Sequence, residues 1–109
     1  MSRYFPTPAE CGHHVIFGTT HVTTFAGEQV QLSFAQIPAG GVIDWHAHPN
    51  EQTGFVIEGR AVFQIGDEEK TLGPGEFFHI PGGLRHRVVA LDAPVKALDV
   101  FHPIRDEYR

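Results

Sequence analysis

The chain has 109 residues, which is enough for one domain with a single hydrophobic core but not for two. Twelve glycines, eight prolines and nine phenylalanines favour short strands and tight turns over helices. The formal charge of −5, with no cluster of Lys and Arg, argues against a nucleic-acid surface. No apolar run approaches membrane-spanning length, and the single cysteine, Cys11, cannot form an internal disulfide. We therefore expect one cytoplasmic domain over residues 1–109 that binds neither nucleic acid nor a membrane.

Short apolar segments alternate with turn signals along the whole chain. Turns are indicated by Gly- and Pro-rich stretches such as Gly73-Pro-Gly75 and Pro81-Gly-Gly83. Residues 2–10 could hold a turn of helix. We predict strands at residues 14–17, 20–26, 29–37, 42–47, 53–58, 60–65, 69–72, 76–80, 85–91 and 95–102. Many short strands at this spacing predict an all-β sandwich or barrel.

Three histidines and a glutamine have the spacing of a metal site in a β-barrel. His46 and His48 are two residues apart and point the same way if they lie on one strand. A Pro-Asn kink follows, after which Gln52 can return to that face. His86 follows the second Gly-rich turn, and a jelly roll can bring the two histidine-bearing segments together inside the barrel. Imidazole and a carbonyl oxygen suit a first-row divalent metal, so Mn, Fe, Co, Ni, Cu and Zn are all compatible.

The two segments resemble the two motifs of the cupin superfamily. The first motif is matched by Gly40, five residues, His46-Ala-His48, three residues, Gln52, six residues and Gly59. The second is matched by Gly75, five residues, Pro81-Gly-Gly83, two residues and His86. The resemblance implies a single-domain, all-β cupin fold (a double-stranded β-helix, or jelly-roll barrel) with one divalent metal bound inside it.

Two positions depart from the cupin pattern. Ala90 stands where the second motif has Asn, and Gln52 replaces the usual Glu. A glutamine ligand is neutral, so the dipositive charge of the metal stays uncompensated and favours anionic substrates. Glu51 is an alternative ligand, although strand alternation points it away from the ligand face.

The last predicted strand carries an unusual carboxylate. Asp99 and Phe101 share one face, opposite Leu98 and Val100. A buried carboxylate needs a partner, and either the metal or Arg105 could serve. A purely structural Asp99–Arg105 pair at the end of the barrel is the competing interpretation.

A narrower resemblance points to small cupins that act on breakdown products of pectin and alginate. Those proteins share this length, the His-x-His-Pro-x-Glu-Gln run and an ending like Asp99-Val-Phe101-His-Pro-Ile-Arg105-Asp-Glu-Tyr108. They convert 4,5-unsaturated uronates to linear keto acids. The resemblance implies that His46, His48, Gln52 and His86 bind the metal and that Asp99, Phe101 and Arg105 surround the substrate.

The residues can be assigned roles in such a reaction. We expect Asp99 to transfer a proton, Arg105 to bind the carboxylate of a small anionic sugar acid, and Phe101 to pack against its ring. Two alternatives stay open: a metal-dependent dioxygenase, and a non-catalytic cupin that binds a sugar acid or another small molecule. By analogy with small cupins we also expect a homodimer, with strand exchange or augmentation through the apolar segments Val15–Phe17 and Val22–Phe25.

Overall fold

The computed structural model describes residues 4–109, and this part of the chain forms ten strands and two short 3-10 helices. All ten predicted strands are present. The elements in chain order are η1 (Pro8–Glu10), β1 (Gly12–Ile16), β2 (Thr20–Ala26), β3 (Gln31–Ile37), β4 (Val42–His46), β5 (Glu51–Glu58), β6 (Ala61–Ile65), β7 (Glu68–Leu72), β8 (Phe77–Ile80), β9 (His86–Ala90), β10 (Val95–His102) and η2 (Asp106–Tyr108). Within these residues no helix is long and apolar enough to cross a membrane.

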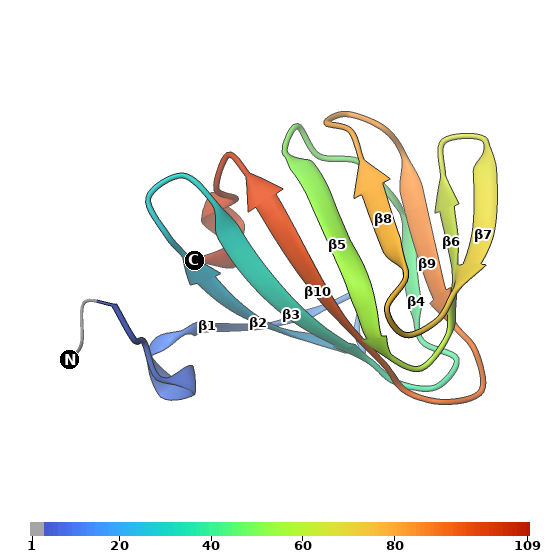
Figure 1. Cartoon of the computed structure of the whole chain (residues 1–109), viewed down its shortest axis with the longest axis horizontal. Coiled ribbons are helices and arrows are strands. Elements are labelled where there is room, and N and C mark those ends of the chain that lie inside the picture. Colours follow the sequence, from blue (N-terminus) through green and yellow to red (C-terminus); the bar gives the residue numbers. More distant parts are fainter. Residues whose placement is uncertain (1–3) are drawn as a thin grey trace.

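The strands form two antiparallel sheets that face each other (Figure 1). The larger sheet has the order β1-β2-β3-β10-β5-β8, and the smaller has the order β4-β9-β6-β7. Alternating burial along β10 and β3 explains the arrangement, because every second side chain points between the sheets. The sequence-predicted all-β jelly roll is therefore confirmed.

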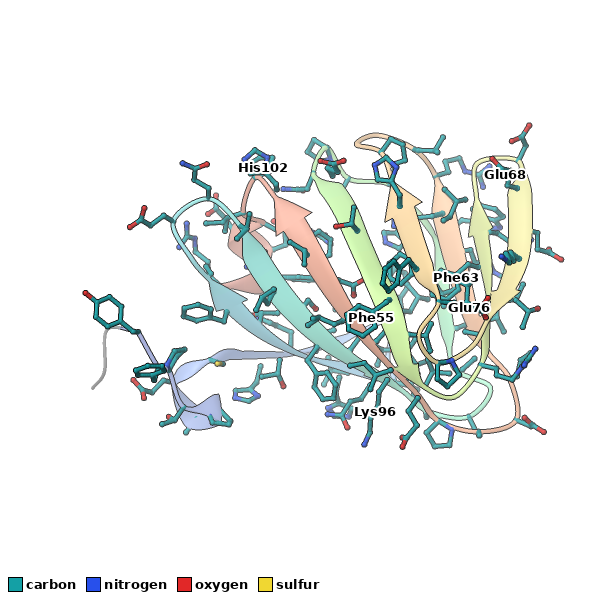
Figure 2. All side chains as sticks on the ribbon, in the orientation of Figure 1. Phe55, Phe63, Glu68, Glu76, Lys96 and His102 are labelled. Carbon is teal, nitrogen blue, oxygen red and sulfur yellow. The ribbon has the colours of Figure 1, made fainter. Side chains whose placement is uncertain are left out.

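The hydrophobic core fills one end of the space between the sheets. Phe63 of β6 stacks on Phe78 of β8, with ring centroids 4.7 Å apart, and so joins the two sheets. Figure 2 shows Phe63 between the sheets and Phe55 on the surface of β5. The core consists of apolar side chains from both sheets: Ile37, Val56, Ala61, Phe63, Leu72, Phe78, Ile80, Val88, Ala90 and Val95.

Polar side chains occupy the other end of the same strands. Along β9, Val88 belongs to the core while His86 begins the strand; along β10, Val95 belongs to the core while Asp99 lies further on. The interior of the barrel therefore changes from apolar to polar along the strands.

Several predicted boundaries differ from the observed ones. The first strand is Gly12–Ile16, so Phe17 lies in the following turn. β4 ends at His46, so His48 lies beyond the strand, whereas β5 already begins at Glu51 and includes Gln52. The helical turn expected within residues 2–10 is η1; residues 2 and 3 lie outside the described part.

Candidate metal centre

The structure brings three of the predicted ligands together. His46 ends β4, His86 begins β9 opposite it, and His48 lies in the connection to β5. One ligating nitrogen from each ring can be chosen so that all lie within 4.8 Å of one another. The group could therefore hold a metal ion, with His48 and His86 buried and His46 half-buried.

A β-bulge directs His46 into the barrel. Between the pairs Ile43–Val88 and His46–His86, β4 has two residues where β9 has one. Strict alternation would place His46 on the opposite face from Ile43, yet both side chains line the same cavity. The bulge therefore makes the change of face, as bulges near functional sites often do. The side chain of Asp44 stabilises it by accepting the backbone N–H of Trp45 at 2.8 Å.

All three imidazole rings are held through the same nitrogen. Each Nδ1 lies within 3.0 Å of a backbone carbonyl oxygen and, in the neutral ring, donates its hydrogen there, which leaves a lone pair on Nε2. The three donor–acceptor pairs are His46–Asp44 at 2.8 Å, His48–Asn50 at 3.0 Å and His86–Leu84 at 2.9 Å.

The rings are also kept neutral. Burial is the largest cause that lowers the pKa of each of the three histidines, and the pKa of His86 falls to about 4. The nearby Arg105 guanidinium acts in the same direction on all three pKa values. Neutral imidazole is the form that binds metal, so these histidines suit a metal ligand set near pH 7.

Gln52 adds an oxygen to this set. Its Nε2 donates to Asp99 Oδ1 at 2.9 Å, which directs its Oε1 to His48 Nε2 at 3.0 Å. Because Nδ1 of His48 carries the ring hydrogen, Nε2 of His48 has a lone pair. This lone pair faces those of Gln52 Oε1. The buried Nε2 of His86 likewise has no hydrogen-bond partner among the described residues. A cation between these atoms would satisfy all of them, so the donor set fits a divalent metal.

Asp99 lies behind Gln52. Its side chain is buried in the barrel with that of Phe101, on the inward face of β10 as predicted. Burial raises the pKa of Asp99 to about 6, against the opposing effects of the Gln52 hydrogen bond and of Arg105. The competing interpretation, a structural Asp99–Arg105 pair, is not seen in the described part of the chain, where Asp99 accepts a hydrogen bond from Gln52 and Arg105 forms an ion pair with Glu107.

Arg105 reaches the cavity from the segment after β10. Its Nε donates to Glu107 at 2.8 Å, and its guanidinium carbon lies 5.2 Å from the Phe101 ring centroid and 4.2 Å from that of Tyr108. The fully buried amide of Gln31 bonds to both the backbone N–H and the carbonyl oxygen of Arg105. The Arg105 side chain is consequently held close to the predicted site.

A cavity joins these groups. His46, His86, Gln52, Asp99, Phe101 and Arg105 all line it, together with Tyr108 and apolar side chains of the core. Its volume of about 50 Å³ accommodates an ion and a few water molecules.

Sequence reasoning missed two residues that line or support this cavity. Gln31 and Tyr108 had no assigned role; the signal for Gln31 was a long amide at an inward position of its strand. Glu51, the alternative ligand, is exposed and pairs with His79 at 2.9 Å.

A family model described as a cupin domain matches residues 33–101, which include all four predicted ligands. The chain belongs to the cupin family. Dimethylsulfoniopropionate lyase DddQ from Ruegeria pomeroyi is 33% identical over 75 residues, 68% of this cupin and 37% of DddQ. An uncharacterized Streptomyces coelicolor protein is 27% identical, over 62% of this cupin and 64% of that protein. The cupin thus spans less than two thirds of each of these curated relatives.

Solved structures share the fold over nearly the whole chain. An RmlC-like cupin from Shewanella frigidimarina superposes with a TM-score of 0.87, at 21% identity, over 99% of this cupin and 97% of that chain. KdgF from Halomonas sp. superposes with a TM-score of 0.84, at 24% identity, over 97% and 98%. At these identities the likeness concerns the fold alone.

Proposed function

We propose that this cupin binds one divalent metal through His46, His48, Gln52 and His86 and converts a 4,5-unsaturated uronate to its linear keto form. The observation that carries the proposal is the position of Asp99, a buried carboxyl group that is hydrogen-bonded to a metal-ligand candidate and borders the cavity. The resemblance of the C-terminal segment to uronate-converting cupins supplies the substrate class.

The reaction is an isomerisation and needs no redox partner. The ring bond between C1 and the ring oxygen breaks while the C1 hydroxyl loses its proton, giving an aldehyde and an enol. The enol becomes a ketone when C4 gains a proton and the enol oxygen loses one. The C1 hydroxyl and then the enol each lose one proton, and the ring oxygen and then C4 each gain one. The protons therefore balance, and one carboxyl group can exchange them.

The side chains of the site divide this chemistry among themselves. A bound divalent metal would supply Lewis acidity for the sugar oxygens. Asp99, with its raised pKa, is suited to exchange a proton near neutral pH. Arg105 would bind the substrate carboxylate, in competition with the exposed Glu107, and Phe101 forms an apolar wall.

The test mixes the metal-loaded protein with unsaturated galacturonate and follows the loss of ultraviolet absorbance of the C=C bond. We expect turnover, and a decrease of about 100-fold or more in kcat for Asp99→Asn. Glu51→Gln is the matched control, because that carboxylate is next to a ligand in sequence but pairs with His79 at the surface. Full activity of Asp99→Asn would show that Asp99 does not transfer the proton.

The 33% identity to DddQ favours a second candidate, a lyase acting on dimethylsulfoniopropionate. The same site could bind that carboxylate through Arg105 and remove the proton next to it through Asp99, so that the C–S bond breaks to give dimethyl sulfide and acrylate. Release of volatile dimethyl sulfide, with no loss of uronate absorbance, would support this function over the first. Oxygen consumption in place of either product would indicate the dioxygenase reaction.

A further inference from the structure

The turn between β1 and β2 holds the chain in an unusual conformation. Phe17 has φ of 50°, in the left-handed region, and is the single non-glycine residue among those described with a positive φ. Gly18 follows with φ of 82°. Two successive residues of this kind are normally Asn-Gly or Gly-Gly, because a bulky side chain is strained there. Phe at the first position therefore calls for an explanation.

The Phe17 side chain does not compensate for this strain by burial. It remains 46% exposed, and the turn around it is exposed as well. Its ring contacts that of His46, with ring centroids 5.1 Å apart and the planes tilted by 48°. The strained residue therefore places an aromatic ring against a metal-ligand candidate.

His46 is the least buried of the three histidines, so the orientation of its ring depends most on a contact from outside the barrel. His48 and His86 are buried, and His48 also packs edge-on against Phe101 at 5.5 Å. His46 is half-buried, contacts His86 on the inner side at 4.2 Å, and belongs to a strand interrupted by the bulge. The hydrogen bond to Asp44 fixes its Nδ1 but leaves its outer surface toward the solvent.

We infer that Phe17 is a positioning residue of the metal centre: it holds the His46 imidazole in its ligating orientation from the solvent side. A strained backbone that persists at a site is commonly kept for its function. Groups around metal ligands that fix their orientation raise metal affinity, and their loss commonly weakens it 10–100-fold. The inference rests on the metal centre and not on the uronate reaction, since it concerns binding of the metal alone.

The experiment measures Co²⁺ binding and thermal unfolding of the metal-free protein. In Phe17→Asn, the new residue tolerates the left-handed conformation but has no aromatic ring. We expect its Kd for Co²⁺ to rise about tenfold, with a changed visible spectrum, while the Tm of the metal-free protein stays equal to or above that of the parent. Phe17→Tyr keeps the ring and should retain the parent Kd.

The matched control is Val30→Asn, a substitution at a residue of the β2–β3 turn that has the same exposed fraction of 46%. It should leave the Kd for Co²⁺ unchanged. An unchanged Kd in Phe17→Asn, or a Kd in Phe17→Tyr that rises as far as in Phe17→Asn, would overturn the inference. A loss of both metal affinity and metal-free Tm in Phe17→Asn would show a packing role instead and would also overturn it. None of these readouts depends on uronate turnover.

Discussion

At the scale of single residues, Gln52 connects the metal centre to the acid–base group. Its amide donates to Asp99 and presents the opposite atom, an oxygen, to His48. A carboxylate at position 52 could not do both, because it has no hydrogen to donate. The departure from the usual cupin Glu therefore has a structural partner in Asp99, which sequence spacing alone did not reveal.

The raised pKa of Asp99 predicts how the metal-free protein responds to pH. The folded state holds this proton up to about pH 6, whereas the unfolded chain releases it near the ordinary carboxyl pKa of 3.8. Folding therefore binds a proton between these values, and Asp99 lowers the free energy of unfolding progressively as pH rises from about 4 to 6. Above that window the loss is about 3 kcal/mol.

Asp99→Asn removes this titration and provides the test. Relative to the parent, the metal-free variant should gain about 2–3 kcal/mol in free energy of unfolding on going from pH 4 to pH 8. Urea unfolding of both proteins at the two pH values measures it. A stability difference that is the same at pH 4 and pH 8 would contradict a raised pKa for Asp99.

At the scale of elements, the strands were predictable and the irregularities between them were not. Alternating apolar residues marked strands such as β10 and placed Asp99 and Phe101 on one face. The bulge in β4 depends on pairing with β9, which is distant in sequence, so alternation within one strand could not indicate it. The Asp99–Gln52 contact also joins two strands that are distant in sequence, so alternation within one strand could not indicate it either. The assumption that one strand carries both His46 and His48 was wrong, although the two rings still meet.

The close approach of β5 and β10 predicts a strict requirement at Gly54. This residue pairs with Asp99, and an added Cβ would lie 2.2 Å from the Leu98 carbonyl oxygen and 2.7 Å from the Phe78 ring. We expect Gly54→Ala to lower the free energy of unfolding by about 1–3 kcal/mol.

Thermal unfolding of the Gly54→Ala variant measures this loss. Gly40→Ala is a useful comparison, because its φ of 70° is unfavourable for Ala but its surroundings are open. If Gly54→Ala and Gly40→Ala lowered the Tm by the same amount and both variants still bound metal, the close approach of the strands at Gly54 would not explain the loss of stability.

At the scale of the whole molecule, the outer surface of the larger sheet is apolar across four strands. Phe34, Leu98, Phe55 and Phe77 pair in one row from β3 to β8, and Phe77 is 76% exposed. Four strands spaced by about 4.8 Å make this row roughly 15 Å wide, and a standard interface buries roughly 800 Å² per partner. We propose that the expected homodimer forms through this surface.

Sedimentation velocity distinguishes this surface from the N-terminal strands that the sequence first suggested. Phe77→Glu should yield a monomer, while Val15→Glu, on the exposed side of β1, should leave a dimer. A monomeric parent, or dissociation by Val15→Glu alone, would contradict the proposal. Strand exchange itself is not required, because β1 pairs with β2 of the same chain along its whole length.

The direction of the Gln52 amide also constrains how this site can diverge. Exchange of Gln52 for Glu would set two carboxyl groups at the 2.9 Å that now separates an amide nitrogen from Asp99 Oδ1. Such a pair must share a proton or separate, because two ionised carboxylates repel each other at that distance. Positions 52 and 99 are thus expected to covary among related chains, with Glu at the first accompanied by an uncharged residue at the second. A lineage that acquires Glu at position 52 is therefore expected to change position 99 as well.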